Sequence, residues 1–89
     1  MYDAGWRHSA VDDLTRIWTA ADSPTRDRLT ETIQRVEAAL RLAPARVGES
    51  RDDGRRILIG PDLCWLFRVS EELRLVAVLA VWQPRRKSA

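Results

Sequence analysis

The sequence contains very few of the residues that usually build disulfides or metal sites. Among its 89 residues there is one cysteine, Cys64, and one histidine, His8. A single cysteine excludes an internal disulfide and a zinc site with several cysteine ligands. Cys64 lies in an alternating apolar stretch, where a free cysteine is usually a small packed residue. We therefore expect neither a metal nor another cofactor.

Long apolar segments are also absent. The longest apolar run, Leu75–Trp82, is far shorter than the roughly 20 residues that a helix needs to cross a bilayer. Residues 1–10 lack the apolar stretch of a secretory signal peptide. Hydrophobic residues nonetheless make up 45% of the chain, as in a folded globular protein. The sequence predicts one cytoplasmic domain over residues 1–89, with a basic tail at 84–89 and no membrane contact.

Lysine is nearly absent as well, so arginine carries almost all of the positive charge. Residues 1–43 have six arginines and seven acidic residues (net −1), whereas residues 44–89 have eight arginines, one lysine and six acidic residues (net +3). Arginine binds phosphate and carboxylate through a planar fork and stays protonated near neutral pH. An ordinary solvated surface is the alternative. The candidate target- or phosphate-binding residues are Arg55, Arg56, Arg68, Arg85 and Arg86.

The first half predicts a short strand and two helices. Residues 2–7 alternate weakly between apolar and polar side chains, which is typical of a strand. Ser9 is a suitable N-cap for the first helix, and Ser23-Pro24 is the start of the second. Pro44 ends the second helix, because the residue before a proline avoids the helical conformation. The short link makes the helices an antiparallel pair. The second helix has an apolar stripe that we expect in the core, formed by Leu29, Ile33, Val36 and Leu40.

The second half changes to a period of two residues, which predicts strands. The expected strands are residues 56–60, 63–69 and 75–82, separated by turns rich in glycine, proline, aspartate and serine. Short turns make these strands an antiparallel meander. The predicted fold class is therefore α+β in the order β-α-α-β-β-β, with the helical hairpin packed on one face of a small antiparallel sheet.

The other face of this sheet has no predicted cover. Residues 75–82 are apolar on both sides, as in a strand that is buried on both faces. An uncovered apolar face is a candidate partner site. A charge at Val78 on this face should then disturb the free protein less than a charge at Ile33. The alternatives are a curled sheet or a homodimer that shields the face. The candidate partner-binding residues on it are Leu66, Val76, Val78 and Trp82.

Several motifs, taken in order, resemble those of RelE/ParE toxins from bacterial type II toxin–antitoxin systems. Residues 48–56, GESRDDGRR, are similar to the glycine- and arginine-rich turn that precedes the sheet in that family. Residues 66–69, LFRV, resemble the family's leucine-tyrosine-arginine-valine strand. Residues 75–82 resemble its final strand, which runs into a basic C-terminus. The resemblance covers nearly the whole chain.

The resemblance implies a growth-inhibiting toxin that a cognate antitoxin holds inactive, as a homodimer or a toxin–antitoxin hetero-oligomer, with plasmid stabilisation as one biological setting. Members of the RelE branch cleave messenger RNA on the ribosome. Members of the ParE branch inhibit DNA gyrase. A non-toxic member that acts only as a partner-binding module is a further alternative.

The catalytic pattern of the RelE branch is not matched. Where that branch has one arginine this chain has Cys64, and where it has another this chain has Pro84. Cleavage of RNA through its 2′-hydroxyl needs a base, an acid and cations on the phosphate. We therefore assign no catalytic residue. The resemblance favours a toxin that binds a target such as DNA gyrase, with the ribosome-dependent mRNA endonuclease as the alternative.

Overall fold

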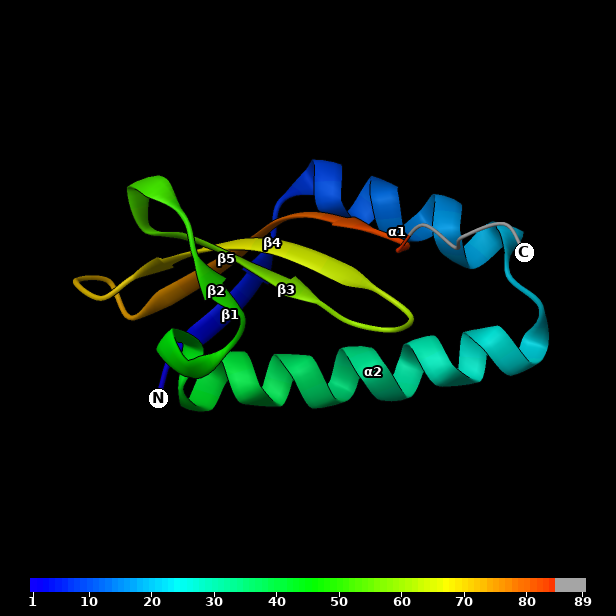
Figure 1. Ribbon diagram of the computed structural model, residues 1–89, viewed down its shortest axis with the longest axis horizontal. Helices are drawn as coiled ribbons and strands as arrows, with labels where there is room; N and C mark the ends of the chain where they lie inside the picture. Colours follow the sequence, from blue (N-terminus) through cyan, green and yellow to red (C-terminus); the bar gives the residue numbers. More distant parts are fainter. Residues whose placement is uncertain (85–89) are drawn as a thin grey trace.

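The computed structural model describes residues 1–84, and its helices and strands follow the predicted order (Figure 1). This confirms the predicted α+β class, and it adds one two-residue strand that the polar sequence of that segment did not reveal. Arg85 and Arg86 lie outside the described residues. The elements are β1 (Asp3–Trp6), α1 (His8–Ala20), α2 (Ser23–Leu42), η1 (Pro44–Arg46), β2 (Glu49–Ser50), η2 (Asp52–Gly54), β3 (Arg55–Ile59), β4 (Cys64–Ser70) and β5 (Leu75–Trp82).

The second helix starts and stops much as the sequence predicts. α2 begins at Ser23, but the residue that caps it is Asp22. The Asp22 carboxylate accepts a hydrogen bond from the Thr25 N–H at 2.9 Å. An aspartate in this position satisfies one of the N–H groups that the first turn leaves without a partner. At the other end α2 stops at Leu42, two residues before Pro44, as predicted. Within residues 1–84, neither helix is long and apolar enough to span a bilayer.

The predicted cap of the first helix is wrong. α1 begins at His8, and Arg7 occupies the cap position without a side-chain hydrogen bond. Ser9 lies inside the first turn, where its hydroxyl donates at 3.4 Å to the carbonyl oxygen of Leu79 on β5. The serine therefore serves a contact between distant parts of the chain, which a local reading of the sequence does not reveal.

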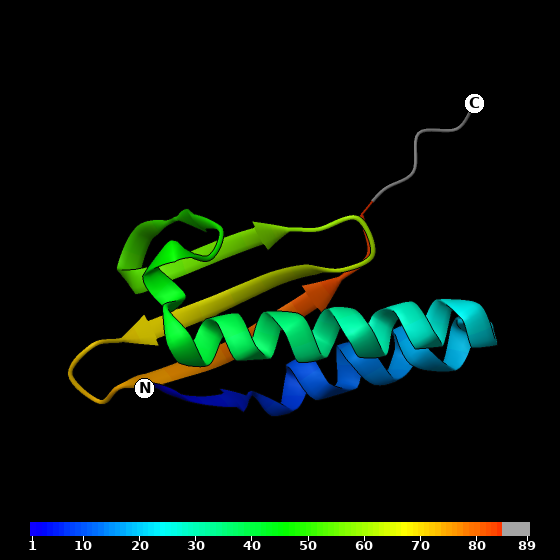
Figure 2. The same cartoon turned by 90° about the horizontal axis from the view of Figure 1, so that it is seen from below.

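The five strands form one mixed sheet in the order β1-β5-β4-β3-β2. β3, β4 and β5 make the predicted antiparallel meander, and β2 pairs antiparallel with β3. β1 is the exception, because it runs parallel to β5 and pairs only with Leu75–Val78. α1 then continues beside the second half of β5, while α2 passes beneath the strands in Figure 1 and in front of β5 in Figure 2.

The core lies between α2 and the strands. From β4, Trp65 and Phe67 are fully buried, and from β5, Val76 and Val78 are fully buried. Full burial of one large apolar side chain contributes about 1.5–3 kcal/mol, so these side chains supply much of the driving force for folding. Ile33, which we expected in the core, is only partly buried at its margin. The buried residues that α2 contributes are Leu29, Thr32, Val36 and Leu40.

A β-bulge at Leu79 decides which side chains of β5 face the core. Phe67 pairs with Val78, whereas its neighbour Leu66 pairs with Ala80, so Leu79 is an extra residue on β5. An extra residue shifts the alternation of the side chains by one position. Val78 is therefore buried, while Ala80 and Trp82 point to the opposite face.

The bulge corrects one prediction from the sequence. Val76 and Val78 were expected on the uncovered face together with Trp82. Both valines are instead fully buried under the helices. The prediction assumed strict alternation from Val76 to Trp82, which the bulge interrupts. The expected order of sensitivity to a charge is wrong for the same reason, because Val78 is a deeper core position than Ile33.

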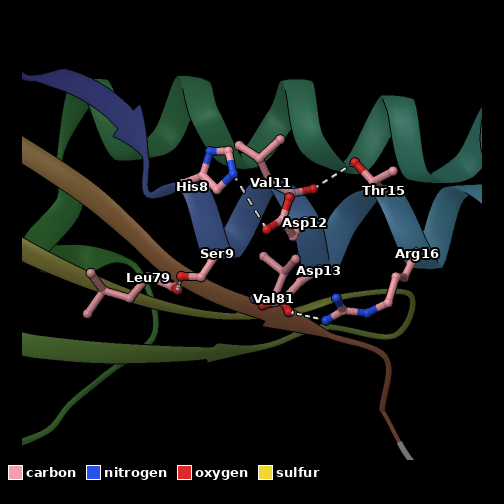
Figure 3. A network of polar contacts seen from close by, with 9 residues as sticks. All are labelled: His8, Ser9, Val11, Asp12, Asp13, Thr15, Arg16, Leu79 and Val81. Carbon is pink, nitrogen blue, oxygen red and sulfur yellow. Dashed lines mark hydrogen bonds and ion pairs between the residues drawn. The ribbon is translucent and has the colours of Figure 1, made fainter.

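Side chains of α1 complete the outer edge of β5 beyond the end of β1 (Figure 3). Backbone N–H and C=O groups on a strand edge need hydrogen-bond partners. The Ser9 hydroxyl reaches the Leu79 carbonyl, and one carboxylate oxygen of Asp13 accepts from the Val81 N–H at 3.3 Å. The other carboxylate oxygen of Asp13 pairs with Arg16 at 2.6 Å. The helix thus contacts the strand at the bulge and two residues beyond it.

Candidate partner-binding face

The sheet has an open face, which is the side of β3, β4 and β5 that the helices do not cover. Register places its apolar side chains in two rows across the strands. Ile59 is 67% exposed and Trp82 is 38% exposed, and the two lie on either side of Cys64 in the same row. The first row is Ile57, Leu66 and Ala80, and the second is Ile59, Cys64 and Trp82.

Cys64 is a packed residue, as the sequence predicts. It lies between Ile59 and Trp82 in register, yet it is only 1% exposed. Its thiol is 4.0 Å from the carbonyl oxygen of Gly60, at the end of β3. Neighbouring side chains cover the sulfur, so Cys64 contributes to the packing of the open face.

The basic end of the open face is a third row, which begins with Arg55 on β3 and Arg68 on β4. These two residues are direct partners in the β3–β4 register, so their side chains leave the sheet on the same side. Arg55 is half-buried and Arg68 is exposed. The Arg55 Nε donates to the carbonyl oxygen of Asp52 at 3.3 Å. Within residues 1–84, no carboxylate oxygen lies within 4.0 Å of either guanidinium group.

Arg56 lies on the opposite side of the sheet from this pair. Its guanidinium donates to the carbonyl oxygen of Val47 at 2.8 Å and to that of Gly48 at 2.9 Å. Gly48 has a φ of 66°, and a Cβ there would collide with the carbonyl of Ile57. Arg56 and Gly48 together hold the segment before β2 against β3. We therefore assign Arg56 to this structural task and no longer propose it as a phosphate ligand.

A hollow of about 550 Å³ lies beside the open face, where β2 and η2 project from β3. Its apolar floor comes from Ile57 and Leu66, and its polar rim includes Arg51 and Arg55. Sequence analysis missed Ile57 and Ile59 as surface residues, although they alternate with Leu58, which packs against the core. It missed the hollow because β2 was not predicted. The lining residues are Ser50, Arg51, Asp52, Arg55, Ile57 and Leu66.

Among the described residues, two titratable groups have clearly shifted pKa values, and neither lies on the open face. The pKa of Tyr2 is raised, first because its hydroxyl donates a hydrogen bond to Glu71. The pKa of Asp22 is lowered, first because its carboxylate accepts the capping hydrogen bond from Thr25. Within residues 1–84, no three potential ligand side chains gather to hold a metal ion. The chemistry of the open face is thus apolar contact combined with arginine.

Comparison with protein-family models and with curated proteins found no match. Solved structures do match. The RelBE2 toxin–antitoxin complex of Mycobacterium tuberculosis contains a chain with a TM-score of 0.72 and 22% identity, and the alignment covers 93% of this chain and 91% of that one. A chain of the chromosomal ParDE system of Pseudomonas aeruginosa has a TM-score of 0.69 and 20% identity, with coverages of 96% and 98%.

The isolated RelE toxin of Escherichia coli is also similar. Its TM-score is 0.65 at 16% identity, and the alignment covers 98% of this chain and 88% of RelE. These neighbours are RelE/ParE proteins of toxin–antitoxin systems, and each is matched over most of its length. The chain therefore has the RelE/ParE-like α+β fold, with two helices packed on a five-stranded mixed sheet.

Proposed function

We propose that this protein is the toxin of a type II toxin–antitoxin pair, and that it acts in the cytoplasm. Free, it slows bacterial growth, and bound to its cognate antitoxin in a hetero-oligomer it is inactive. The observation that supports this proposal is the shared fold, together with an open sheet face. That face combines exposed apolar side chains with two arginines that have no carboxylate partner within residues 1–84. Fold alone does not define function, so the features of this face are needed as well.

The open face is the surface that we assign to the antitoxin. Leu66 and Trp82 remain candidate contacts, and Ile59 replaces the buried valines as the third apolar contact. Covering these three side chains would remove on the order of 200 Å² of apolar surface from water. At about 25 cal/mol per Å² this stabilises the complex by about 5 kcal/mol, before the cost of association is subtracted.

For the target we favour inhibition by binding, with DNA gyrase as the candidate. The described part of the open face offers arginine side chains, which stay protonated near neutral pH and do not act as general bases. A binding inhibitor needs no proton transfer, only a surface that fits its target. An apolar area beside a basic row meets that requirement.

Ribosome-dependent cleavage of mRNA is the second candidate. One observation favours it, which is the pair of arginines that leaves the open face side by side. Two guanidinium groups at this spacing suit a phosphodiester as well as a carboxylate. We rank this candidate second because Cys64 and Pro84 stand where the RelE branch has arginines.

Induced expression tests the proposal. We expect growth of the bacterial host to slow when the protein is produced alone and to recover when the antitoxin is produced with it. Purified protein should inhibit supercoiling by gyrase and leave ribosome-bound mRNA intact. Normal growth at a verified level of soluble protein would overturn the toxin assignment, whereas codon-associated cleavage of mRNA would replace gyrase with the ribosome as the target.

A further inference from the structure

Arg55 and Arg68 are directly opposed on β3 and β4, and like charges are unfavourable in directly opposed positions of a sheet. Directly opposed residues on neighbouring strands have Cβ atoms about 4.5–5.5 Å apart, and two cations at this distance destabilise the pairing. Some arginines of the described residues have carboxylate partners, as Arg16 does with Asp13 and Arg28 with Asp62. Others, such as Arg35 and Arg46, have none within 4.0 Å, but they do not face a second arginine in the sheet. The Arg55–Arg68 pair is thus a site of unbalanced positive charge on the open face.

We propose that the Arg55–Arg68 pair binds a carboxylate side chain of the antitoxin segment that covers the open face. This inference rests on the proposed function and deepens it, because it names the chemistry by which that partner is recognised. A carboxylate placed between two guanidinium groups accepts charge-assisted hydrogen bonds from both forks. Binding then removes the repulsion that the free protein carries.

The position of the pair also defines the pattern of the partner. Along β4, Arg68 is two residues from Leu66 and four from Cys64, and Cys64 pairs with Trp82 on β5. A strand rises about 3.3 Å per residue, so the apolar rows lie about 7 Å and about 13 Å from the arginines. The partner segment therefore carries an acidic side chain at one end and apolar side chains at these two distances from it.

The acidic groups around the hollow favour a peptide over a nucleic acid. Asp52 lines the hollow beside Arg55, and the Glu49 carboxylate is 3.5 Å from Arg51, which also lines it. A nucleic acid presents a continuous row of phosphates, which these carboxylates repel. A peptide with one acidic residue and an apolar side meets the arginines and the apolar rows while it avoids Asp52 and Glu49.

Binding of the cognate antitoxin to the double variant Arg55→Gln/Arg68→Gln tests this inference. The matched control is Arg35→Gln/Arg46→Gln, which removes the same charge from exposed positions on α2 and η1. We expect the Arg55/Arg68 variant to bind about a hundredfold more weakly than wild type, with a smaller loss of affinity on adding salt. We expect the control to bind within about threefold of wild type.

Thermal melting of the free proteins separates recognition from structure. Because the pair is repulsive, the Arg55/Arg68 variant should melt at the same temperature as wild type or higher. Unchanged antitoxin affinity would overturn the inference, and so would a Tm lowered by several degrees. Loss of binding to a short single-stranded RNA with antitoxin binding retained would instead assign the pair to nucleic acid. Normal growth of the host on induction would overturn the toxin assignment. The measured dependence of antitoxin binding on Arg55 and Arg68 would still stand.

Discussion

The two faces of β5 contain similar residues but have different surroundings. Toward the helices, Val76, Val78 and Val81 are almost completely buried and belong to one continuous core. On the other side, Ala80 and Trp82 remain accessible beside Leu66. Hydrophobicity does not distinguish the two sets, because the whole strand is apolar. The difference comes from the layer above each face. We therefore expect stability to depend on the covered face, and we propose the open face for recognition.

The largest expected effect compares one charge placed on either face of β5. Val78→Glu buries a carboxylate in the core and should lower the free energy of unfolding by about 4 kcal/mol or more. Ala80→Glu should cost less than about 1 kcal/mol while it blocks the antitoxin. Urea denaturation measures both, with Ile33→Glu expected between them. Equal destabilisation by Val78→Glu and Ala80→Glu would mean that the side chain of Ala80 is packed as deeply as that of Val78.

A smaller effect is expected at Asp13, which links α1 to the strand that carries both faces. Asp13→Ala leaves the Val81 N–H without its acceptor and Arg16 without its carboxylate, and we expect a loss of about 1–2 kcal/mol. Hydrogen exchange at the Val81 amide should accelerate. Asp12→Ala is the control, because Asp12 is more exposed and pairs with the exposed His8 of its own helix, at 3.7 Å. Equal exchange in the two variants would contradict the role of Asp13.

The smallest effect on stability is expected at Asp22, which caps the helix that covers the sheet and does not lie on the open face. The lowered pKa of Asp22 means that its ionised form stabilises the folded state. The contribution is present above the unfolded pKa, near 3.8, and is lost as the pH falls through the lower folded value. The Tm difference between wild type and Asp22→Ala should therefore be constant near neutral pH and shrink below about pH 4. Antitoxin affinity at pH 7 should not change.

Local patterns predict most of this fold because most of its elements depend on local chemistry. Pro44 ends α2 by restricting its own neighbour, and Leu63–Val69 alternates regularly enough to predict β4. Where a residue acts across the chain, the sequence is less informative. Ser9 looks like a helix cap but bonds Leu79, 70 positions away.

The candidate site was predicted in part for the same reason. Leu66 and Trp82 were placed correctly on the open face, and Arg55 and Arg68 were selected without knowledge that they face each other. Val76 and Val78 were misplaced because a bulge leaves no mark in a run of valine, alanine and leucine. Arg56 was selected for its charge, whereas the carbonyl groups of Val47 and Gly48 already occupy its guanidinium.

The bulge at Leu79 also bears on the order in which the chain folds. Because Leu75–Trp82 is apolar on both sides, a slip by one residue costs this strand little hydrophobic burial, and β4 alone does not fix its register. Ser9 and Asp13 bond to β5 at Leu79 and Val81, and these contacts exist in only one register. We therefore expect β5 to reach its final register as α1 docks, and a Ser9→Ala/Asp13→Ala variant to populate slipped pairings of β5.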